Sequence, residues 1–306
     1  MTAIDAVPEV PLRRAVLIGL IGEGVTPSLT PPMHELEGAR HGMHYVYRTI
    51  DLAPGESTEE YVGRLLADAR RLGFDGLNVT HPVKQTVLPL LDELAPAART
   101  VGAVNTVVFD GDRMIGHNTD VTGFGAAFDE TLGDAPRDLV VLVGAGGAGA
   151  AVASALAARE VGELVIADAA PGRAAALAAS VAEVSTGRVR SIGTDELAGA
   201  LADADGVVNA TPFGMAAHPG AAFDVGLVPG RAFVADVVYR PVETELLVAA
   251  RDRGCRVMSG LGMAMHQAAD AFEIFTGEPA DREAMLADLT DLVAVEASGT
   301  TPPWHR

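Results

Sequence analysis

Apolar runs alternate with amphipathic segments along the first 120 residues. The apolar run at residues 15–21, followed by a glycine, predicts a buried strand. Residues 57–73 begin with Ser57 and Thr58 as candidate caps and end at Gly73, which predicts a helix. By the same signals, strands are predicted at residues 15–21, 44–51, 76–80, 103–109 and 113–120, and helices at 31–42, 57–73 and 82–95. This β-α-β-α-β order predicts parallel pairing in part of the region.

The alternation repeats after a helix predicted at about residues 122–132. Strands are predicted at 138–143, 164–168, 188–193, 206–210, 233–238 and 255–259, with helices beginning at about 145 and 173 and at 195–201 and 243–254. This order is typical of a doubly wound parallel sheet. Two further helices, at about 262–276 and 281–295, have no strand after them. We therefore expect them to fold back on the first domain.

The pattern as a whole predicts an α/β protein of two domains. An N-terminal α/β substrate domain with a mostly parallel sheet is expected from residues 1–121 and 262–306, and a Rossmann dinucleotide-binding domain from residues 122–261. A chain of 306 residues that is 49% hydrophobic is long enough to bury two cores. The tail SGTTPPWHR is expected to be disordered.

Charge and composition exclude several classes of partner. The net charge is −19 and no run of Lys or Arg exists, so neither nucleic acid nor an acidic membrane surface is an expected partner. A single cysteine, Cys255, excludes a disulfide framework and a cysteine-based metal site. His81 and His266 are expected at the core or the rim, and no group has metal-ligand spacing. The N-terminus lacks a leader pattern, so a cytoplasmic location is expected.

A glycine-rich turn follows the strand in DLVVLVGAGGAGAAVASAL. Gly144, Gly146 and Gly149 fit G-x-G-x-x-G, the turn that lets a pyrophosphate approach the start of a helix. The strand before this turn and the helix after it strengthen the interpretation. The alternative is that the glycines simply begin a helix in a fold that binds no nucleotide. The predicted dinucleotide-binding loop comprises Gly144, Ala145, Gly146, Gly147, Ala148 and Gly149.

Asp168 indicates which dinucleotide is bound. It lies at the end of the next strand, where a carboxylate accepts hydrogen bonds from a ribose diol and repels a 2′-phosphate. Ala169 and Ala170 follow, so no adjacent guanidinium holds such a phosphate, and Arg173 is expected in the next helix. NAD is therefore predicted in preference to NADP. The alternative is an Asp that caps a helix and binds no ligand.

Lys84 is the only lysine among 22 Lys and Arg residues. A guanidinium stays charged, whereas a lysine amine can exchange a proton near neutral pH in the right surroundings. It lies in one of four polar stretches at predicted strand ends, and chance or ordinary turn and cap chemistry would explain each stretch taken alone. The stretches are TPSLTP (26–31), NVTHPVK (78–84), GAVNTV (102–107) and GHNTD (116–120). Together they supply hydroxyls, amides, one cation and one anion, which suits a polyhydroxylated ligand.

The chain resembles the shikimate dehydrogenase family over nearly its whole length. The matching motifs are PSLTP followed by PMH, NVTHPVKQ, GAVNTV, GHNTDVTGF, GAGGAGAAVA, NATPFGM, DVVYRP and GMAMHQAADAF, in the family's order. The resemblance implies reversible oxidation of a ring hydroxyl of a cyclic polyhydroxy acid, quinate or shikimate, with a nicotinamide cofactor. It implies Lys84 and Asp120 as the catalytic pair.

The same resemblance implies the remaining site residues. Substrate is expected on Ser28, Thr30, Asn78, Thr80, Asn105, Tyr239 and Gln267. Besides the glycine loop, Asp168 and Arg173, the cofactor is expected on Asn209, Thr211, Pro212, Met215, Val237, Gly260 and Met263. A homodimer stays open.

Two departures from the family pattern bear on specificity. Thr30 stands where the family commonly has serine, which adds a methyl group near the expected substrate carboxylate. Asp168 and Ala169 replace the Asn-Arg of NADP-using members. With these two departures together, the chain resembles the NAD-dependent quinate/shikimate dehydrogenase branch of the family. An aminoshikimate or aminoquinate dehydrogenase, a biosynthetic shikimate dehydrogenase and a non-catalytic NAD sensor remain as alternatives, while the lysine motif and the NTD motif together argue against a methylenetetrahydrofolate dehydrogenase.

Overall fold

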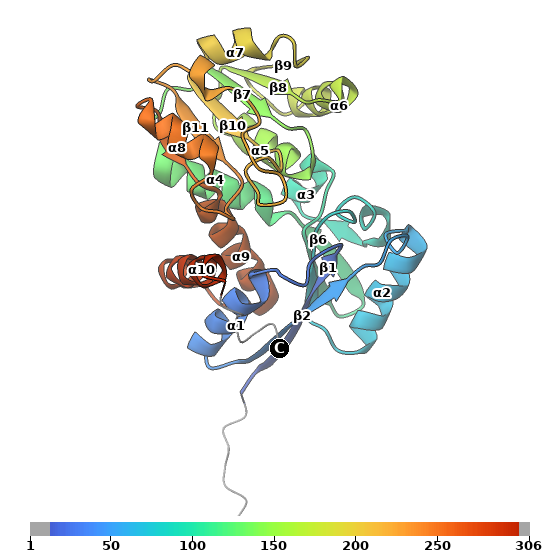
Figure 1. The fold of residues 1–306 in the computed structure, drawn as a ribbon. Coiled ribbons are helices and arrows are strands. Elements are labelled where there is room, and N and C mark those ends of the chain that lie inside the picture. Colours follow the sequence, from blue (N-terminus) through green and yellow to red (C-terminus); the bar gives the residue numbers. More distant parts are fainter. Residues whose placement is uncertain (1–12, 300–306) are drawn as a thin grey trace, which may run out of the picture.

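The structure is a computed structural model that describes residues 13–299. Two six-stranded sheets, one from each half of the chain, carry helices on their faces (Figure 1). This is the predicted α/β architecture. The expectations about the N-terminal leader and most of the C-terminal tail lie outside the described residues.

The first sheet has the strand order β2-β1-β3-β5-β6-β4. β1 pairs in parallel with β2 and β3, while β5 is antiparallel to both β3 and β6. Parallel pairing is thus confirmed for part of this region. The strands are β1 (Ala15–Gly22), β2 (His44–Asp51), β3 (Gly76–Val79), β4 (Glu93–Leu94), β5 (Thr106–Asp110) and β6 (Arg113–His117), and the helices are α1 (Thr30–Arg40), α2 (Glu59–Arg71) and α3 (Pro96–Val101).

The predicted helix at residues 82–95 is wrong. The segment forms turns, the short 3-10 helix η1 (Leu88–Leu90) and strand β4. Pro89 explains this, because proline lacks an N–H and clashes with the preceding turn of a helix. Val83 and Val87 are fully buried and anchor the turns, and Val104 N–H donates to the Lys84 carbonyl at 2.9 Å. The segment is therefore fixed without being helical, and α3 after it was not predicted.

The second sheet is parallel throughout, with the order β12-β11-β10-β7-β8-β9. Its chain order reverses between β7 and β10, the place where doubly wound sheets bind ligands at their carboxyl ends. Its strands are β7 (Leu139–Val143), β8 (Glu163–Ala167), β9 (Arg188–Ile192), β10 (Gly206–Asn209), β11 (Phe233–Asp236) and β12 (Arg256–Met258). Its helices are α4 (Thr119–Leu132), α5 (Gly147–Ala157), α6 (Pro171–Ala182), α7 (Leu197–Asp203) and α8 (Glu245–Asp252), with a 3-10 turn η2 (Val225–Leu227).

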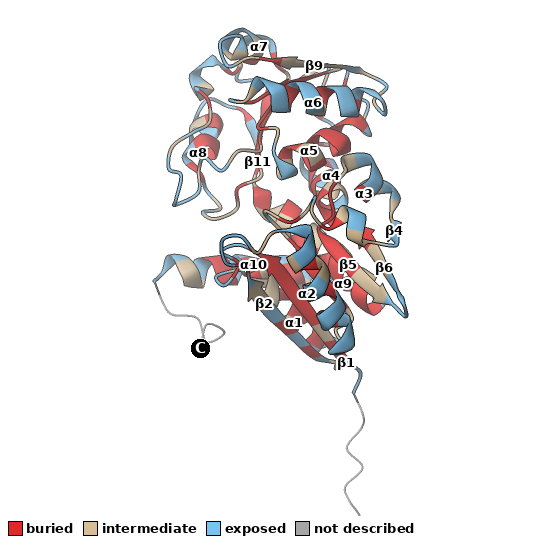
Figure 2. Ribbon diagram, turned by 90° about the vertical axis from the view of Figure 1, so that its right-hand side faces the viewer, coloured by how far each residue is buried: buried red, intermediate tan, exposed pale blue. Residues whose placement is uncertain are grey.

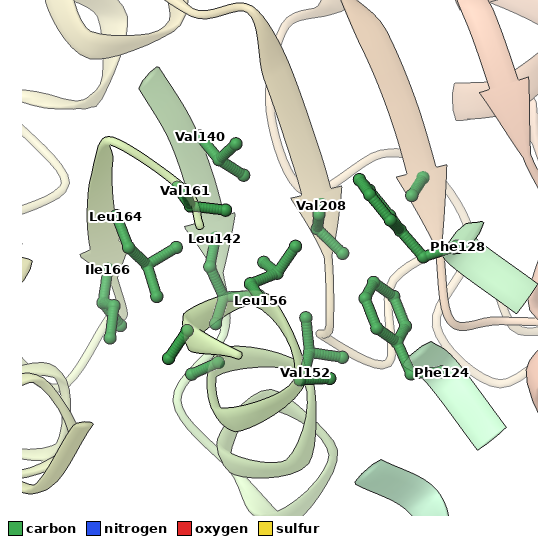
Figure 3. Packing of buried hydrophobic residues seen from close by; sticks show 14 of the residues in the cluster. Phe124, Phe128, Val140, Leu142, Val152, Leu156, Val161, Leu164, Ile166 and Val208 are labelled. Carbon is green, nitrogen blue, oxygen red and sulfur yellow. The ribbon is translucent and has the colours of Figure 1, made fainter. Parts of the chain in front are cut away.

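One apolar cluster packs α4 and α5 against this sheet. Leu142, Val208 and Leu156 are fully buried in it beside the rings of Phe124 and Phe128 (Figure 3). The central strands, such as β3, β10 and β11, are buried, whereas the outer strand β9 and helices such as α2, α6 and α7 show exposed residues (Figure 2). No helix within residues 13–299 combines the length and apolarity that crossing a bilayer requires.

The last two helices, α9 (Gly260–Thr276) and α10 (Arg282–Ala297), return to the first sheet, as expected. Phe272 and Phe275 of α9 are buried with Ile18 and Tyr45 of that sheet. α9 also packs along α4, and Gly123 permits this, since a Cβ there would lie 2.7 Å from the main-chain N of Gln267. The contact brings the start of α4 beside α9.

Phe128→Ala is expected to lower the free energy of unfolding by about 3–5 kcal/mol, because it leaves a cavity in a tightly packed core. Phe128 is fully buried, with ring centroids 6.0 Å from Phe124 and 5.5 Å from Phe233. Urea denaturation followed by circular dichroism measures the loss. Val248→Ala, on the exposed side of α8, is the control and is expected to change little. Equal effects of both variants would contradict the core assignment.

Candidate active site

A cavity of about 390 Å³ lies at the carboxyl ends of β1 and β3, facing α9. It is lined by all nine residues for which a catalytic or substrate role was predicted, which come from segments spread over most of the chain. They are Ser28, Thr30, Asn78, Thr80, Lys84, Asn105, Asp120, Tyr239 and Gln267. The structure therefore brings together a set that the sequence could only assemble from motifs.

The Lys84 ammonium contacts the Asp120 carboxylate in this cavity, with Nζ 2.5 Å from Oδ2. Both side chains are largely buried, at 21% and 13% exposure, yet reach the cavity surface. Asn118 caps α4 and accepts the Asp120 N–H, so Asp120 is a first-turn residue and not the cap. The helix dipole favours a negative charge at that position.

The amide groups of Asn78 and Asn105 connect the ends of β3 and β5 to this pair. Asn105 Nδ2 donates to Asp120 Oδ1 at 2.9 Å, and Asn78 Nδ2 donates to Thr106 Oγ1 at 2.9 Å. Tyr47 O–H donates to Asn78 Oδ1 at 2.6 Å. Thr106 and Tyr47 were missed by sequence reasoning. Thr106 lies within a motif already singled out, whereas no sequence signal pointed to Tyr47.

The opposite wall of the cavity comes from loops. Ser28 Oγ accepts the Thr30 N–H at 3.2 Å, and Arg240 Nη1 donates to the Pro27 carbonyl at 3.1 Å. Arg240 also lines the cavity and was missed, although it directly follows Tyr239 in the DVVYRP motif. Burial raises the pKa of Tyr239, so its phenol stays protonated and able to donate. This wall suits a ligand with carboxylate and hydroxyl groups.

The glycine loop lies directly beside the lysine. Gly144 has φ +106°, and a Cβ at Gly149 would lie 2.0 Å from the Gly144 carbonyl O, so only glycine fits there. A Cβ at Gly147 would lie 3.9 Å from Lys84 Cδ. A cavity of about 720 Å³ shares Thr80, Lys84 and Ala148 with the first cavity, and it is also lined by Ala145, Gly146, Gly147 and Arg173. The loop and the lysine thus line adjoining cavities.

Asp168 lies across the loop in a further cavity of about 310 Å³. Gly144, Gly146, Arg173, Thr211 and Pro212 line the same cavity. The carboxylate accepts N–H groups from Ala145 at 2.8 Å and Ala170 at 2.7 Å. Partial burial acts to raise the pKa of Asp168, but these hydrogen bonds and Arg173 outweigh it and lower the pKa below its ordinary value.

Arg173 lies in α6 as expected, but its guanidinium is not remote from Asp168. Its Nη2 is 2.9 Å from Asp168 Oδ1. The expectation that no guanidinium is available beside Asp168 to hold a 2′-phosphate is therefore corrected, because the first turn of α6 brings Arg173, the nearest arginine in the sequence, back over the end of β8. The Arg173 side chain is 62% exposed, so it pairs with Asp168 at the surface.

Three predicted cofactor residues, Gly149, Asn209 and Met215, do not line these cavities. Gly149 acts through packing, and Met215 is exposed. Asn209 is fully buried, where its amide donates to Asp236 at 2.9 Å and its oxygen accepts the Thr211 N–H. Burial raises the pKa of Asp236. Val237, Gly260 and Met263, also predicted to bind the cofactor, line the cavity of about 390 Å³ together with Lys84 and Asp120.

The residues present fit a dinucleotide. Gly146 lines two cavities and a Cβ there would meet nothing within 4 Å, which leaves open space at the N-terminus of α5 for a pyrophosphate. Asp168 offers acceptor oxygens for a ribose. Over residues 13–299, no cluster of three or more His, Cys, Asp or Glu has the geometry to hold a metal ion. His266 is buried beside Glu130, 3.0 Å from its carboxylate.

A dinucleotide loop beside a lysine–carboxylate pair, on adjoining cavities of a two-domain α/β fold, is the arrangement of a dinucleotide-dependent oxidoreductase. Three family models match the chain. They are the shikimate dehydrogenase substrate binding domain at residues 20–107, shikimate / quinate 5-dehydrogenase at 128–216, and the shikimate 5'-dehydrogenase C-terminal domain at 260–289. The chain belongs to the shikimate dehydrogenase family.

Individual relatives are similar over almost the whole chain. A shikimate dehydrogenase (NADP(+)) of Streptomyces avermitilis is 52% identical, covering 92% of this chain and 97% of the relative. A quinate/shikimate dehydrogenase (NAD(+)) of Corynebacterium efficiens is 50% identical, covering 91% and 99%. The solved structure of quinate dehydrogenase from Corynebacterium glutamicum in complex with NAD superposes with a TM-score of 0.86 at 49% identity, covering 91% and 100%. Relatives named for either cofactor are thus similarly close.

Gly149→Ala is expected to weaken dinucleotide binding about tenfold or more, because the new methyl group displaces the Gly144 main chain. Isothermal titration with NAD measures the dissociation constant. Gly172→Ala in α6 is the matched control, since a Cβ there meets nothing within 4 Å. Unchanged affinity in Gly149→Ala would show that the loop does not hold the dinucleotide.

Proposed function

We propose that this protein oxidises a ring hydroxyl of quinate, shikimate or both, reversibly and with NAD, to 3-dehydroquinate or 3-dehydroshikimate. The observation that carries the proposal is the contact between Lys84 and Asp120 in a polar cavity that opens beside the glycine loop. The domain limits that go with it are residues 1–121 and 262–306 for the substrate domain and 122–261 for the dinucleotide domain.

The dinucleotide, when bound, supplies the hydride acceptor. The residues of the chain transfer the proton of the substrate hydroxyl. In oxidation Lys84 acts as the neutral amine and accepts the hydroxyl proton to become the ammonium, and in reduction the ammonium returns that proton, as a positioned acid–base group does. Asp120 holds the ammonium in place by a direct hydrogen bond. Arginine at position 84 would orient a hydroxyl but could not exchange its proton near neutral pH.

The remaining cavity residues are placed to bind the carboxylate and the other ring hydroxyls of the substrate. The hydroxyls of Ser28 and Thr30 bind the carboxylate at the loop wall. Arg240 also lines this wall, but its guanidinium is paired with Glu296 and donates to the Pro27 carbonyl, so it supports the loop more than it supplies a free charge. The amides of Asn78, Asn105 and Gln267, with Thr80 and Tyr239, bind the ring hydroxyls. The volume of about 390 Å³ lies in the usual range for a small-molecule site.

Asp168 supports NAD as the preferred cofactor. Its carboxylate is ionised at neutral pH, accepts hydrogen bonds and repels a 2′-phosphate. The salt bridge with Arg173 opposes this preference in part, because an exposed guanidinium at 2.9 Å could turn towards a phosphate. A biosynthetic shikimate dehydrogenase that uses NADP is the second candidate, and the relative from Streptomyces avermitilis favours it.

Purified protein is expected to reduce NAD with quinate or shikimate at a kcat/KM at least about tenfold above that with NADP, a difference of roughly 1.4 kcal/mol. Reduced-cofactor absorbance, with each acid and each cofactor, measures this. Asp168→Asn is expected to lower the ratio of kcat/KM with NAD to kcat/KM with NADP, because it removes the negative charge. Asp203→Asn, exposed at the end of α7, is expected to leave this ratio unchanged. A higher rate with NADP would favour the second candidate, and no turnover with any pair would refute the family activity for this chain.

Lys84→Arg is expected to keep the fold and NAD affinity while lowering kcat by about 10²–10⁴-fold, the usual contribution of a positioned acid–base group. Steady-state kinetics, NAD titration and circular dichroism separate the three properties. Arg71→Lys, exposed on α2, is the control for an exchange between the two cations. Near wild-type turnover in Lys84→Arg would exclude the proton-transfer role.

A further inference from the structure

A line of buried hydrogen bonds runs from Tyr47 on β2 to the catalytic carboxylate. Tyr47 O–H donates to Asn78 Oδ1 at 2.6 Å, and Asn78 Nδ2 donates to Thr106 Oγ1 at 2.9 Å. Thr106 Oγ1 donates to Asn105 Oδ1 at 3.0 Å, and Asn105 Nδ2 donates to Asp120 Oδ1 at 2.9 Å. Every group passes its hydrogen in the same direction, towards Asp120.

The direction is fixed by groups that can act in only one way. The Thr119 N–H donates to Asn105 Oδ1 at 2.8 Å, so the Asn105 amide must turn its NH₂ towards Asp120. The Asn105 main-chain carbonyl accepts from Asn78 Nδ2 at 3.2 Å, so the Asn78 oxygen must face Tyr47. A carbonyl oxygen has no hydrogen to give, and Tyr47 is therefore the donor at the start of the line.

Because the line is buried, the loss of any one of its hydrogen bonds is costly in free energy. Tyr47, Asn78, Asn105 and Thr106 are each at most 5% exposed, so water does not replace a missing partner easily. Burial also raises the pKa of Tyr47 well above its ordinary range, and the phenol keeps its proton. In such surroundings hydrogen bonds that point the same way strengthen one another.

We propose that Tyr47 is a positioning residue for the reaction, acting through Asn78, Thr106 and Asn105 to hold the Asp120 carboxylate against Lys84. The inference rests on the proposed function, because it assigns Tyr47 to the same catalytic pair. Tyr47 itself does not line the substrate cavity, so its effect on turnover must pass through the other residues of the line.

Tyr45, two residues earlier on β2, provides a matched control. It is also buried, and its hydroxyl lies 3.1 Å from His34 Nδ1, a group outside the line. Tyr45→Phe and Tyr47→Phe each remove one buried hydroxyl from the same strand and the same apolar cluster. A purely structural role predicts equal losses of stability and activity for the two variants.

Tyr47→Phe is expected to lower kcat about three- to tenfold, as loss of one buried hydrogen bond implies, without changing the KM for NAD. Thr106→Val, which breaks the line in its middle, is expected to lower kcat similarly, and Thr106→Ser, which keeps the hydroxyl, restores it. Tyr45→Phe keeps the wild-type kcat. Steady-state kinetics with quinate and shikimate, alongside urea denaturation of each variant, provide these values.

Three results would overturn the proposal. The first is a Tyr47→Phe enzyme whose kcat matches that of Tyr45→Phe. The second is a Tyr47→Phe enzyme in which only the KM for the acid rises, which would limit Tyr47 to orienting Asn78 for substrate. The third is a wild-type protein without turnover, which would refute the proposed function and the catalytic role of the line together. In the first case, wild-type turnover that is lost in Lys84→Arg but unchanged in Tyr47→Phe refutes the positioning role and leaves the proposed function standing.

Discussion

The site depends on the close packing of α4 against α9. Gly123 makes this contact possible, because a Cβ there would lie 2.9 Å from the Met263 carbonyl O and 2.7 Å from the Gln267 N. α4 carries Asp120 at its start and continues into the core of the second sheet, while α9 carries Met263 and Gln267 and packs on the first sheet. A wider separation of the two helices would enlarge the cavity between the proposed catalytic pair, Lys84 and Asp120, and α9.

Local geometry, and not the overall charge, makes an acidic protein suited to an acidic ligand. The net charge is −19, yet the cations Lys84 and Arg240 that line the cavity balance the carboxylates Glu23 and Asp120 there, and the remaining polar lining consists mainly of hydroxyls and amides. Charges more than about 8 Å apart at the surface are largely screened at physiological salt, so the distant carboxylates weigh little. By the same principle, the effect proposed for Asp168 on cofactor choice is a short-range one, exerted by a carboxylate that the loop main chain holds in place.

The alternation of apolar runs and amphipathic segments was sufficient to predict the α/β architecture, because buried strands and the helices that cover them have different hydrophobic periodicities. Both sheets and the return of the last two helices followed from it, whereas the glycine turn was predicted from its motif. Residues 118–120, predicted as the end of a strand, form instead the cap and first turn of α4, and α3 was not predicted. The largest departure was the segment 82–95. Its apolar residues fit a helical pattern, but Pro89 and the burial of Val83 and Val87 favoured turns. The periodicity of the sequence does not reveal which residues will be buried, so it could not predict that turns would form instead of a helix.

The sequence by itself determined which chemical groups the protein has: one lysine, the motif that contains it, and a carboxylate after the dinucleotide loop. The tertiary structure alone decided which of them meet. Tyr47 reaches Asn78 over the intervening strand β1, and Arg173 folds back onto Asp168. The physical reason is that hydrogen bonds and ion pairs act over about 3 Å, and packing, not chain order, sets distances on that scale.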